Sequence, residues 1–264
     1  MNMANGVLIF DISGPMAHFR KYYTNSSSLS YAFPPRTVIT GMVAGFLGWE
    51  RDSYYSILAP EHCSVAVKLQ TGFRKIFQTV NYLFVKSLSD LNGSSGHTQI
   101  PVEFVVPALG EKEISYRVYF THQDQKIMEE LAKVLANKKF AYPPYLGLSE
   151  LIATVEPVAL EGVTIDAIPP GEAVEVCTPV NTALLEKNGI LFEVPDSEVA
   201  LQYIKERMPL SFLPGRRPGG VADFIFEKNR RLIRAKLKTP VWRLKYLDSE
   251  ETIAFMEGES NAGQ

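Results

Sequence analysis

The sequence predicts an α+β fold, in which a ferredoxin-like domain carries an inserted β-hairpin and is followed by a β-rich C-terminal lobe. Runs of strand type and two amphipathic helices follow in the order strand, helix, strand, strand, strand, helix, strand. This order is close to the split βαβ plan with one hairpin added. After Pro157 the chain consists of short β-like pieces separated by proline and glycine. The same plan underlies the RRM, whose sheet commonly binds single-stranded RNA.

These patterns also predict the domain boundaries. The stretch SLSDLNGSSG separates two β-like runs and suggests the turn of an inserted hairpin, and the last residues are acidic and end in Gly, Asn and Gln. We therefore expect the ferredoxin-like domain at residues 1–158, its inserted hairpin at about 86–112, the β-rich lobe at 159–247 and an acidic flexible tail at 248–264.

Local signals predict the first strand and the first helix. Residues 7–12 form an apolar run that ends at a Gly-Pro breaker, as a buried strand does before a loop. From Arg36 onward apolar residues recur at helical spacing behind Pro35, which the start of a helix tolerates. Gly41 and Gly45, one turn apart, predict a close contact between this helix and the sheet.

The later elements follow from periodicity. Residues 124–138 carry apolar side chains at i, i+4 and i+7 with polar residues between them, which predicts an amphipathic helix. The stretch KNRRLIRAKLK alternates basic and apolar residues, which fits either an edge strand guarded by charge or a nucleic-acid face. Further strands are predicted at 64–69, 77–85, 115–120 and 151–155.

Composition argues against several classes of protein. No apolar run approaches the ~18 residues that cross a bilayer, and the N-terminus lacks the basic head of a signal peptide, so we expect a cytoplasmic protein with no membrane partner. Cys63 and Cys177 lie far apart and predict neither a disulfide nor a zinc site. The histidines are not at metal-ligand spacing, and the common phosphate-binding and hydrolase motifs do not occur. No metal and no cofactor are predicted.

Charge is distributed unevenly along the chain. The formal net charge is −2, but residues 147–206 hold 11 acidic and 2 basic residues, whereas residues 207–246 hold 11 basic and 2 acidic ones. Two interpretations remain open: two ordinary solvated faces, or a basic nucleic-acid surface beside an acidic face that repels or binds something else.

The loop between the first strand and the first helix is the most informative segment. It is too polar for a core, and loops of this length are commonly functional. It combines cations with Phe19, Tyr22, Tyr23 and Tyr31, an asparagine and three serines. Cations neutralise phosphates, and aromatic rings stack on unpaired bases at ~1 to 3 kcal/mol each. The loop therefore predicts RNA binding, and the alternative is a surface loop whose tyrosines pack on the core.

Two further segments are candidates for RNA or partner contact. Arg216 and Arg217 lie among glycines in LPGRRPGGVADF, where the backbone can approach a polyanion and paired arginines can bind phosphate oxygens. The same pattern also fits a solvated turn. Lys86 and His97 flank the turn of the inserted hairpin, which is exposed and which we expect to touch a partner.

Four blocks in order resemble the Cas-five family of CRISPR-associated proteins, most closely its type I-B branch. They are GPMAHFRKYYTNSSSLSYAFPPRTVITGMVAGFLG, TQIPVEF before YRVYF, YPPYLGLSEL and FLPGRRPG, and they run from residue 14 to about residue 218. The resemblance implies a RAMP domain, which is RRM-like, with a thumb hairpin. In the family's Cascade effectors such subunits cap the 5′ handle of the guide RNA (crRNA) without catalysis. By position in the motifs, the residues implied to contact RNA are His18, Arg20, Lys21, Tyr22, Ser26, Ser27, Ser28 and Arg36.

The resemblance also implies partners and an alternative activity. The expected partners are a Cas-seven backbone subunit, a Cas-eight large subunit and, through the assembled complex, target DNA, in antiviral defence or another guided use. One branch of the family, in type I-C systems, cleaves the precursor transcript without a metal by means of Tyr, Lys and His. His18, Lys21 and Tyr22 are of those residue types, so a metal-independent endoribonuclease is the alternative to a binding subunit.

Overall fold

The computed structural model describes residues 5–192 and 201–258. Two α-helices and three short 3₁₀ turns accompany many strands in this part of the chain. The helices and turns are α1 (Arg36–Phe46), α2 (Gln125–Asn137), η1 (Leu88–Asn92), η2 (Thr182–Leu184) and η3 (Pro214–Arg216). The strands are β1 (Leu8–Gly14), β2 (Phe19–Arg20), β3 (Ser30–Tyr31), β4 (Cys63–Leu69), β5 (Phe73–Leu83), β6 (His97–Pro107), β7 (Ile114–His122), β8 (Thr154–Ala159), β9 (Thr164–Ile168), β10 (Ala173–Val176), β11 (Val180–Asn181), β12 (Leu185–Ile190), β13 (Tyr203–Leu213), β14 (Arg217–Glu227), β15 (Ile233–Leu237), β16 (Val241–Tyr246) and β17 (Ser249–Ile253).

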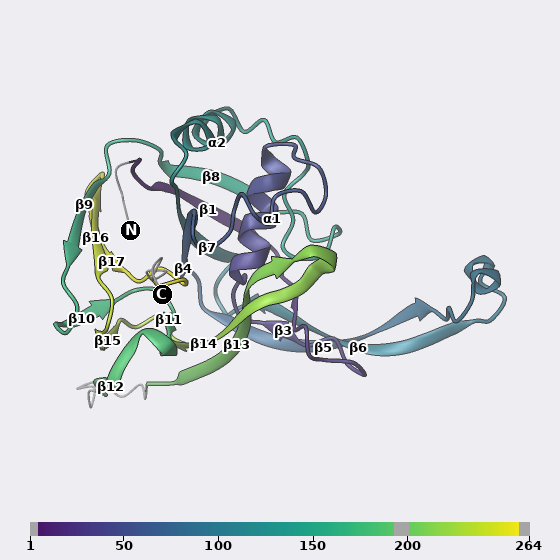
Figure 1. Cartoon of the computed structure of the whole chain (residues 1–264). Coiled ribbons are helices and arrows are strands. Elements are labelled where there is room, and N and C mark those ends of the chain that lie inside the picture. Colours follow the sequence, from purple (N-terminus) through teal and green to yellow (C-terminus); the bar gives the residue numbers. More distant parts are fainter. Residues whose placement is uncertain (1–4, 193–200, 259–264) are drawn as a thin grey trace.

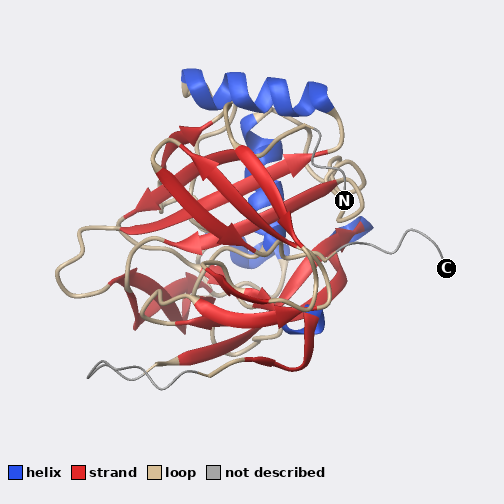
Figure 2. Ribbon diagram, turned by 90° about the vertical axis from the view of Figure 1, so that its left-hand side faces the viewer, coloured by secondary structure: helices blue, strands red, loops and turns tan. Residues whose placement is uncertain are grey.

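A four-stranded sheet forms the centre of the molecule. Its strand order is β4-β7-β1-β8, and each neighbouring pair is antiparallel. Both helices lie on one side of it (Figures 1 and 2), where the Phe10 ring of β1 meets the Phe46 ring of α1 edge to face at 6.4 Å. Alternate residues of the strands point to this side, because successive side chains of a strand face opposite ways.

Both predicted helices are confirmed. The second begins at Asp124, whose side chain accepts a hydrogen bond from the Lys126 backbone N–H and so satisfies one free donor of the first turn. It buries Met128, Leu131 and Leu135, which are the apolar positions of the predicted stripe. Neither helix in the described ranges is long and apolar enough to cross a membrane.

The other face of the central sheet is covered by the C-terminal lobe. Ile9, Ala66 and Tyr119 are each 0% exposed on this face, and they pack with Tyr246 of β16 and Phe255. Arg117 of β7 adds a polar link, because its guanidinium donates to the hydroxyl oxygen of Tyr246 on β16 at 2.9 Å. Protein therefore occupies the face of this sheet that in an RRM commonly binds single-stranded RNA.

A long hairpin of β5 and β6 projects from the body (Figure 1). Its register runs from Phe73 opposite Pro107 to Leu83 opposite His97, so the hairpin starts well before the predicted residue 86. The predicted range 86–112 holds the turn, β6 and the segment beyond β6. The sequence predicts a separate strand at 77–85, and in the structure this segment belongs to the first arm of the hairpin. Asp90 orders the turn by accepting from the Lys86 and Ser87 backbone N–H groups at 2.9 and 2.8 Å.

The basic and acidic segments of the C-terminal lobe pair with each other. Strand β15, from the stretch KNRRLIRAKLK, is the central strand between β10 and β12 and is not an edge. Its Arg234 stands opposite Glu175 of β10, and Arg243 of β16 stands opposite Asp166 of β9. The two opposed segments of the sequence are therefore interleaved in the fold, which removes the argument for one continuous basic surface.

The predicted flexible tail is wrong for residues 248–258. Strand β17 pairs with β16, and Phe255 and Met256 beyond it are 6% and 1% exposed. The acidic residues of this segment made it look like an exposed tail. In the fold, the carboxylate of Glu251 is paired with Lys68 at 2.5 Å, which compensates its charge. Residues 259–264 of the predicted tail lie outside the described residues.

Candidate nucleic-acid interface

The loop between β1 and α1 lies along the edge of β6 at the base of the hairpin. Its short strands β2 and β3 pair with each other. The backbones of Ala17 and Val105 exchange two hydrogen bonds of 2.8 Å, and further along Glu103 donates to Ser28 O at 2.8 Å. The loop and the hairpin therefore form one structural unit, as unpaired strand edges favour.

His18 and Ser28 hold this unit together from inside. The His18 side chain is 3% exposed, with Nδ1 2.7 Å from Glu103 O and Nε2 2.9 Å from Ser28 Oγ. Its ring also lies 5.7 Å from that of Phe104. Burial lowers the pKa of His18 below its ordinary value of 6.5. The prediction that His18 and Ser28 contact RNA is wrong, because both side chains are buried and bonded to each other.

A cluster of two lysines and two glutamates joins the loop, the hairpin and β13. Lys21 Nζ lies 3.2 Å from Glu206 Oε1, and Lys75 Nζ lies 3.2 Å from the same oxygen. Lys75 also pairs with Glu103 at 3.3 Å and donates to Ser30 O at 2.6 Å. The second oxygen of Glu206 accepts from the Ala32 backbone N–H at 2.9 Å. We call Lys21, Lys75, Glu103 and Glu206 the charge cluster.

Aromatic and cationic side chains remain exposed next to the charge cluster. Tyr22 and Tyr23 are 43% and 49% exposed, with their rings edge to face at 5.2 Å. Arg20 is exposed and its guanidinium donates to Thr24 O at 3.3 Å. Phe77, 61% exposed, lies two residues beyond Lys75 and so on the same side of β5. These four side chains, Arg20, Tyr22, Tyr23 and Phe77, are the candidate interface, and the exposed Ser26 and half-buried Ser27 belong to the same loop.

The loop tyrosines are divided between the surface and the core. Tyr31 is 1% exposed and packs in the core, with Lys21 Nζ 5.5 Å from its ring centroid. Its hydroxyl is buried without a hydrogen-bond partner among the described residues. Burial raises the pKa of Tyr31, so this phenol stays neutral.

Arg36 is a structural residue, and the prediction that it contacts RNA is wrong. It is 2% exposed, pairs with the carboxylate of Glu257, and donates to the carbonyl oxygens of Leu58 at 2.9 Å and Cys63 at 2.7 Å. A third bond reaches Leu210 O at 3.1 Å. The guanidinium thus ties the start of α1 to β13 and to the C-terminal segment.

The other predicted residues lie apart from the candidate interface. Arg216 forms an ion pair at 3.0 Å with Asp52, which lies in the loop after α1. Arg217 is exposed and donates to Pro214 O at 3.4 Å. Lys86 and His97 are both exposed, at the far end of the long hairpin (Figure 1).

Four residues of the charge cluster and the candidate interface were missed from the sequence. Lys75, Glu103 and Glu206 act through partners far away in the sequence, so no local spacing predicts them. Phe77 could have been predicted as an exposed aromatic residue, because it is followed by the polar residues Gln78 and Thr79 in a strand that is largely polar.

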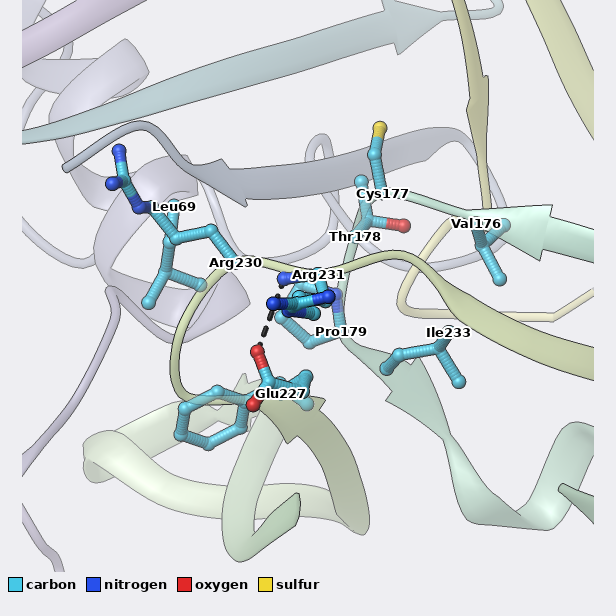
Figure 3. Close-up of a pocket in the computed structure, with 10 residues that line it drawn as sticks. Leu69, Val176, Cys177, Thr178, Pro179, Glu227, Arg230, Arg231 and Ile233 are labelled. Carbon is cyan, nitrogen blue, oxygen red and sulfur yellow. Dashed lines mark hydrogen bonds between the residues drawn. The ribbon is translucent and has the colours of Figure 1, made fainter. Parts of the chain in front are cut away.

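A small hollow lies between β4 and the turn that joins β14 to β15 (Figure 3). The buried carboxylate in it, Glu227, accepts from the backbone N–H groups of Arg231 at 3.0 Å and Gln202 at 2.8 Å, so its burial is explained by donors of its own chain. Across the described residues, no three His, Cys, Asp or Glu side chains are grouped so as to hold a metal ion.

Comparisons with known proteins identify the family. The model of the family described as CRISPR-associated protein (Cas5) matches residues 7–225. A crystal structure of a CRISPR protein from Archaeoglobus fulgidus is similar at a TM-score of 0.56 and 12% identity, over 93% of this chain and 98% of that chain. A chain of a CRISPR RNA-guided surveillance complex is similar at a TM-score of 0.45 and 13% identity, over 88% of this chain and 91% of that chain. No curated protein matches. The mostly β fold with two helices is shared with the first of these structures, and the family match covers most of the sequence: the chain belongs to the CRISPR-associated protein Cas5 family.

Proposed function

We propose that the chain is a non-catalytic, RNA-binding subunit of a type I CRISPR Cascade effector, of the type I-B branch, and that it caps the 5′ handle of the crRNA. The observation that carries the proposal is the candidate interface. The charge cluster fixes the loop against the hairpin and leaves Arg20, Tyr22, Tyr23 and Phe77 exposed together. Exposed rings beside a cation are the usual means of binding single-stranded nucleic acid.

The architecture supports the same assignment. The strand order β8-β1-β7-β4, with helices in the two crossovers, supports a ferredoxin-like domain. We assign the β5–β6 hairpin as its thumb. Phe77 lies near the base of the thumb, and β5 and β6 carry exposed Asn81 and Gln99 opposite each other on the same side. A base could stack on Phe77 while these amides bind base edges or sugar hydroxyls.

The partners follow from this role. A capping subunit would contact a Cas-seven backbone subunit and a Cas-eight large subunit, and would reach target DNA through the assembled ribonucleoprotein in the cytoplasm. Antiviral defence or another guided use of the complex is the expected setting.

The side-chain geometry supports binding over cleavage. A general base must come within hydrogen-bond reach of a ribose hydroxyl. Both ring nitrogens of His18 are bonded to Glu103 O and Ser28 Oγ, and Lys21 is engaged by Glu206. Of the three residue types expected for the endoribonuclease, only Tyr22 is exposed here. Metal-independent cleavage of the precursor transcript is therefore the second candidate.

A binding assay and a cleavage assay run together test the proposal. Labelled repeat RNA is incubated with the chain, alone and with its partner subunits, in EDTA and across a salt series. We expect retention of the 5′ handle that weakens with salt, with intact RNA. Arg20→Ala should reduce the salt slope by about 0.7, the value for one phosphate contact on a single strand. Lys133→Ala, on the exposed side of α2, is the control of equal charge change.

The outcomes separate the candidates. Products that appear without metal and disappear in His18→Ala would make the chain a nuclease. Arg20→Ala with unchanged affinity and salt slope, in a complex that still binds the handle, would remove the candidate interface from the account.

A further inference from the structure

The exposed side of the C-terminal half of α1 takes no part in the candidate interface. The predicted contact between its glycines and the sheet is wrong, because both glycines are half-buried and a Cβ at neither would come within 4 Å of a sheet residue. A Cβ at Gly41 would stand 2.9 Å from the hydroxyl oxygen of Tyr54, which explains that glycine. A Cβ at Gly45 would meet no described atom within 4 Å. Glycine inside a helix is destabilising relative to alanine, so the described chain gives no reason for Gly45.

Exposed apolar side chains follow in the chain segment that lies next to Gly45. The segment after α2 is attached to the helix end, since the Tyr142 backbone N–H donates to Gly45 O at 3.3 Å. Tyr142 is 58% exposed, and Tyr145 and Ile152, which pair in an isolated bridge, are 46% and 58% exposed. We call Gly45, Tyr54, Tyr142, Tyr145 and Ile152 the α1 patch.

The patch continues across the loop after α1 to the β13–β14 hairpin. The Tyr54 and Tyr55 rings are 4.9 Å apart, and the Tyr55 and Phe212 rings are 5.7 Å apart. Burial raises the pKa of Tyr54 to about 12, with smaller effects from Tyr55, Arg216 and Tyr145 nearby. One aromatic surface thus runs over three segments that are distant in the sequence.

The charges at its rim favour a protein over a nucleic acid. Arg216 and Arg51 both lie on the carboxylate of Asp52, at 3.0 and 3.6 Å, so these cations are already partly neutralised for a polyanion. Two guanidinium groups on one carboxylate still leave an excess positive charge that one acidic side chain could balance. Exposed aliphatic residues such as Ile152 and Leu213 add nothing to base stacking, whereas Tyr and Arg around an apolar centre are typical of protein interfaces.

We propose that the α1 patch docks a neighbouring protein subunit, which places an apolar side chain in the open space above Gly45 and an acidic residue against Arg51 and Arg216. Gly45 is then kept because a side chain there would occupy the partner's place. This surface is separate from the candidate interface. Only the identity of the neighbour, another subunit of the same effector, depends on the proposed function.

Two substitutions at one residue test the proposal. Gly45→Ala in the isolated chain should raise the Tm by about 2 to 4 °C, because helix propensity improves and the new methyl group meets nothing. Gly45→Leu should weaken association with one of the other subunits, each purified singly, at least tenfold in a titration by light scattering or calorimetry. Arg216→Glu should weaken the same association. Ala136→Leu, at an exposed position of α2, is the matched control.

Handle RNA binding is measured on the same variants. The proposal expects Gly45→Leu and Arg216→Glu to bind handle RNA as the wild type does. Unchanged association of Gly45→Leu with every subunit would overturn the proposal, and so would a loss of RNA affinity in place of subunit affinity, which would assign the patch to nucleic acid. Failure of the wild-type complex to bind the handle would instead count against the proposed function and leave the association result to be judged by itself.

Discussion

Replacing Arg36 by methionine should unfold the protein far more easily and should do so whether or not RNA is present. The guanidinium is 2% exposed and has Glu257 and three backbone carbonyls as partners. Its loss leaves a carboxylate buried at 6% residue exposure with the Val65 N–H as its remaining donor. Removing one member of a buried ion pair costs about 3 to 5 kcal/mol. That is a large part of the roughly 5 to 15 kcal/mol that holds a typical domain folded.

Urea denaturation followed by circular dichroism measures this cost. With an m-value of about 3 kcal/mol/M, a loss of 3 to 5 kcal/mol lowers the midpoint by roughly 1 to 1.7 M. Arg243→Met, at a half-exposed pair with Glu250, is the control and should change the midpoint little. Glu257→Leu combined with Arg36→Met should cost less than the sum of the single changes. A midpoint like that of the control, together with weaker handle binding, would refute the burial of Arg36 and restore it as an RNA contact.

Three further predictions concern the hairpin, the histidine and the C-terminus. Phe77→Ala should weaken handle RNA binding by about 5- to 150-fold, the range for one stacked base, with no fall in Tm because the ring is 61% exposed. Because the pKa of His18 is lowered in the folded state, the unfolded chain takes up a proton on this imidazole at a higher pH than the folded chain does. The free energy of unfolding should therefore be constant above about pH 6.5 and should fall below it by at most about 1.4 kcal/mol per pH unit. His18→Gln should flatten that part of a pH series of urea midpoints. Deleting residues 249–264 removes β17 and Glu257, and should yield an insoluble or unfolded chain on gel filtration, whereas a folded product would contradict the buried C-terminal segment.

Regular elements were predictable because their signals are local. The apolar stripe of Met128, Leu131 and Leu135 lies within one short window, and the structure buries all three. The β5–β6 hairpin was predicted to exist but was placed too late, because the polar turn at 84–96 is conspicuous and the register that begins at Phe73 is not.

The candidate site was harder to predict, because burial in the fold decides which of its charged residues are free to bind RNA. Arg20, Lys21 and Arg36 look alike as cations near tyrosines, yet one is exposed, one is paired with Glu206 and one is buried with Glu257. The deciding partners lie more than 180 residues away in the sequence, since Glu206 follows Lys21 by 185 positions and Glu257 follows Arg36 by 221. Tertiary contacts of this kind carry no local signal.

The covering of the central sheet was also invisible to local patterns. Ile9 and Tyr119 alternate along their strands with residues that face the helices. From the sequence, such a strand can belong to a sheet with one face in water or to a sheet buried on both faces. The cover comes from β9 and β16 of the predicted lobe and from β17 and Phe255, which lie beyond its predicted end.

The most direct test of the account is to locate the crRNA on the protein. The effector complex is assembled on handle RNA that carries 4-thiouridine, irradiated, and the crosslinked peptides are identified by mass spectrometry. We predict crosslinks to the peptides that contain Tyr22, Tyr23 and Phe77, because their rings are exposed beside the charge cluster. Crosslinks confined to the α1 patch or to the C-terminal lobe, with none to the loop or the hairpin, would contradict the central claim.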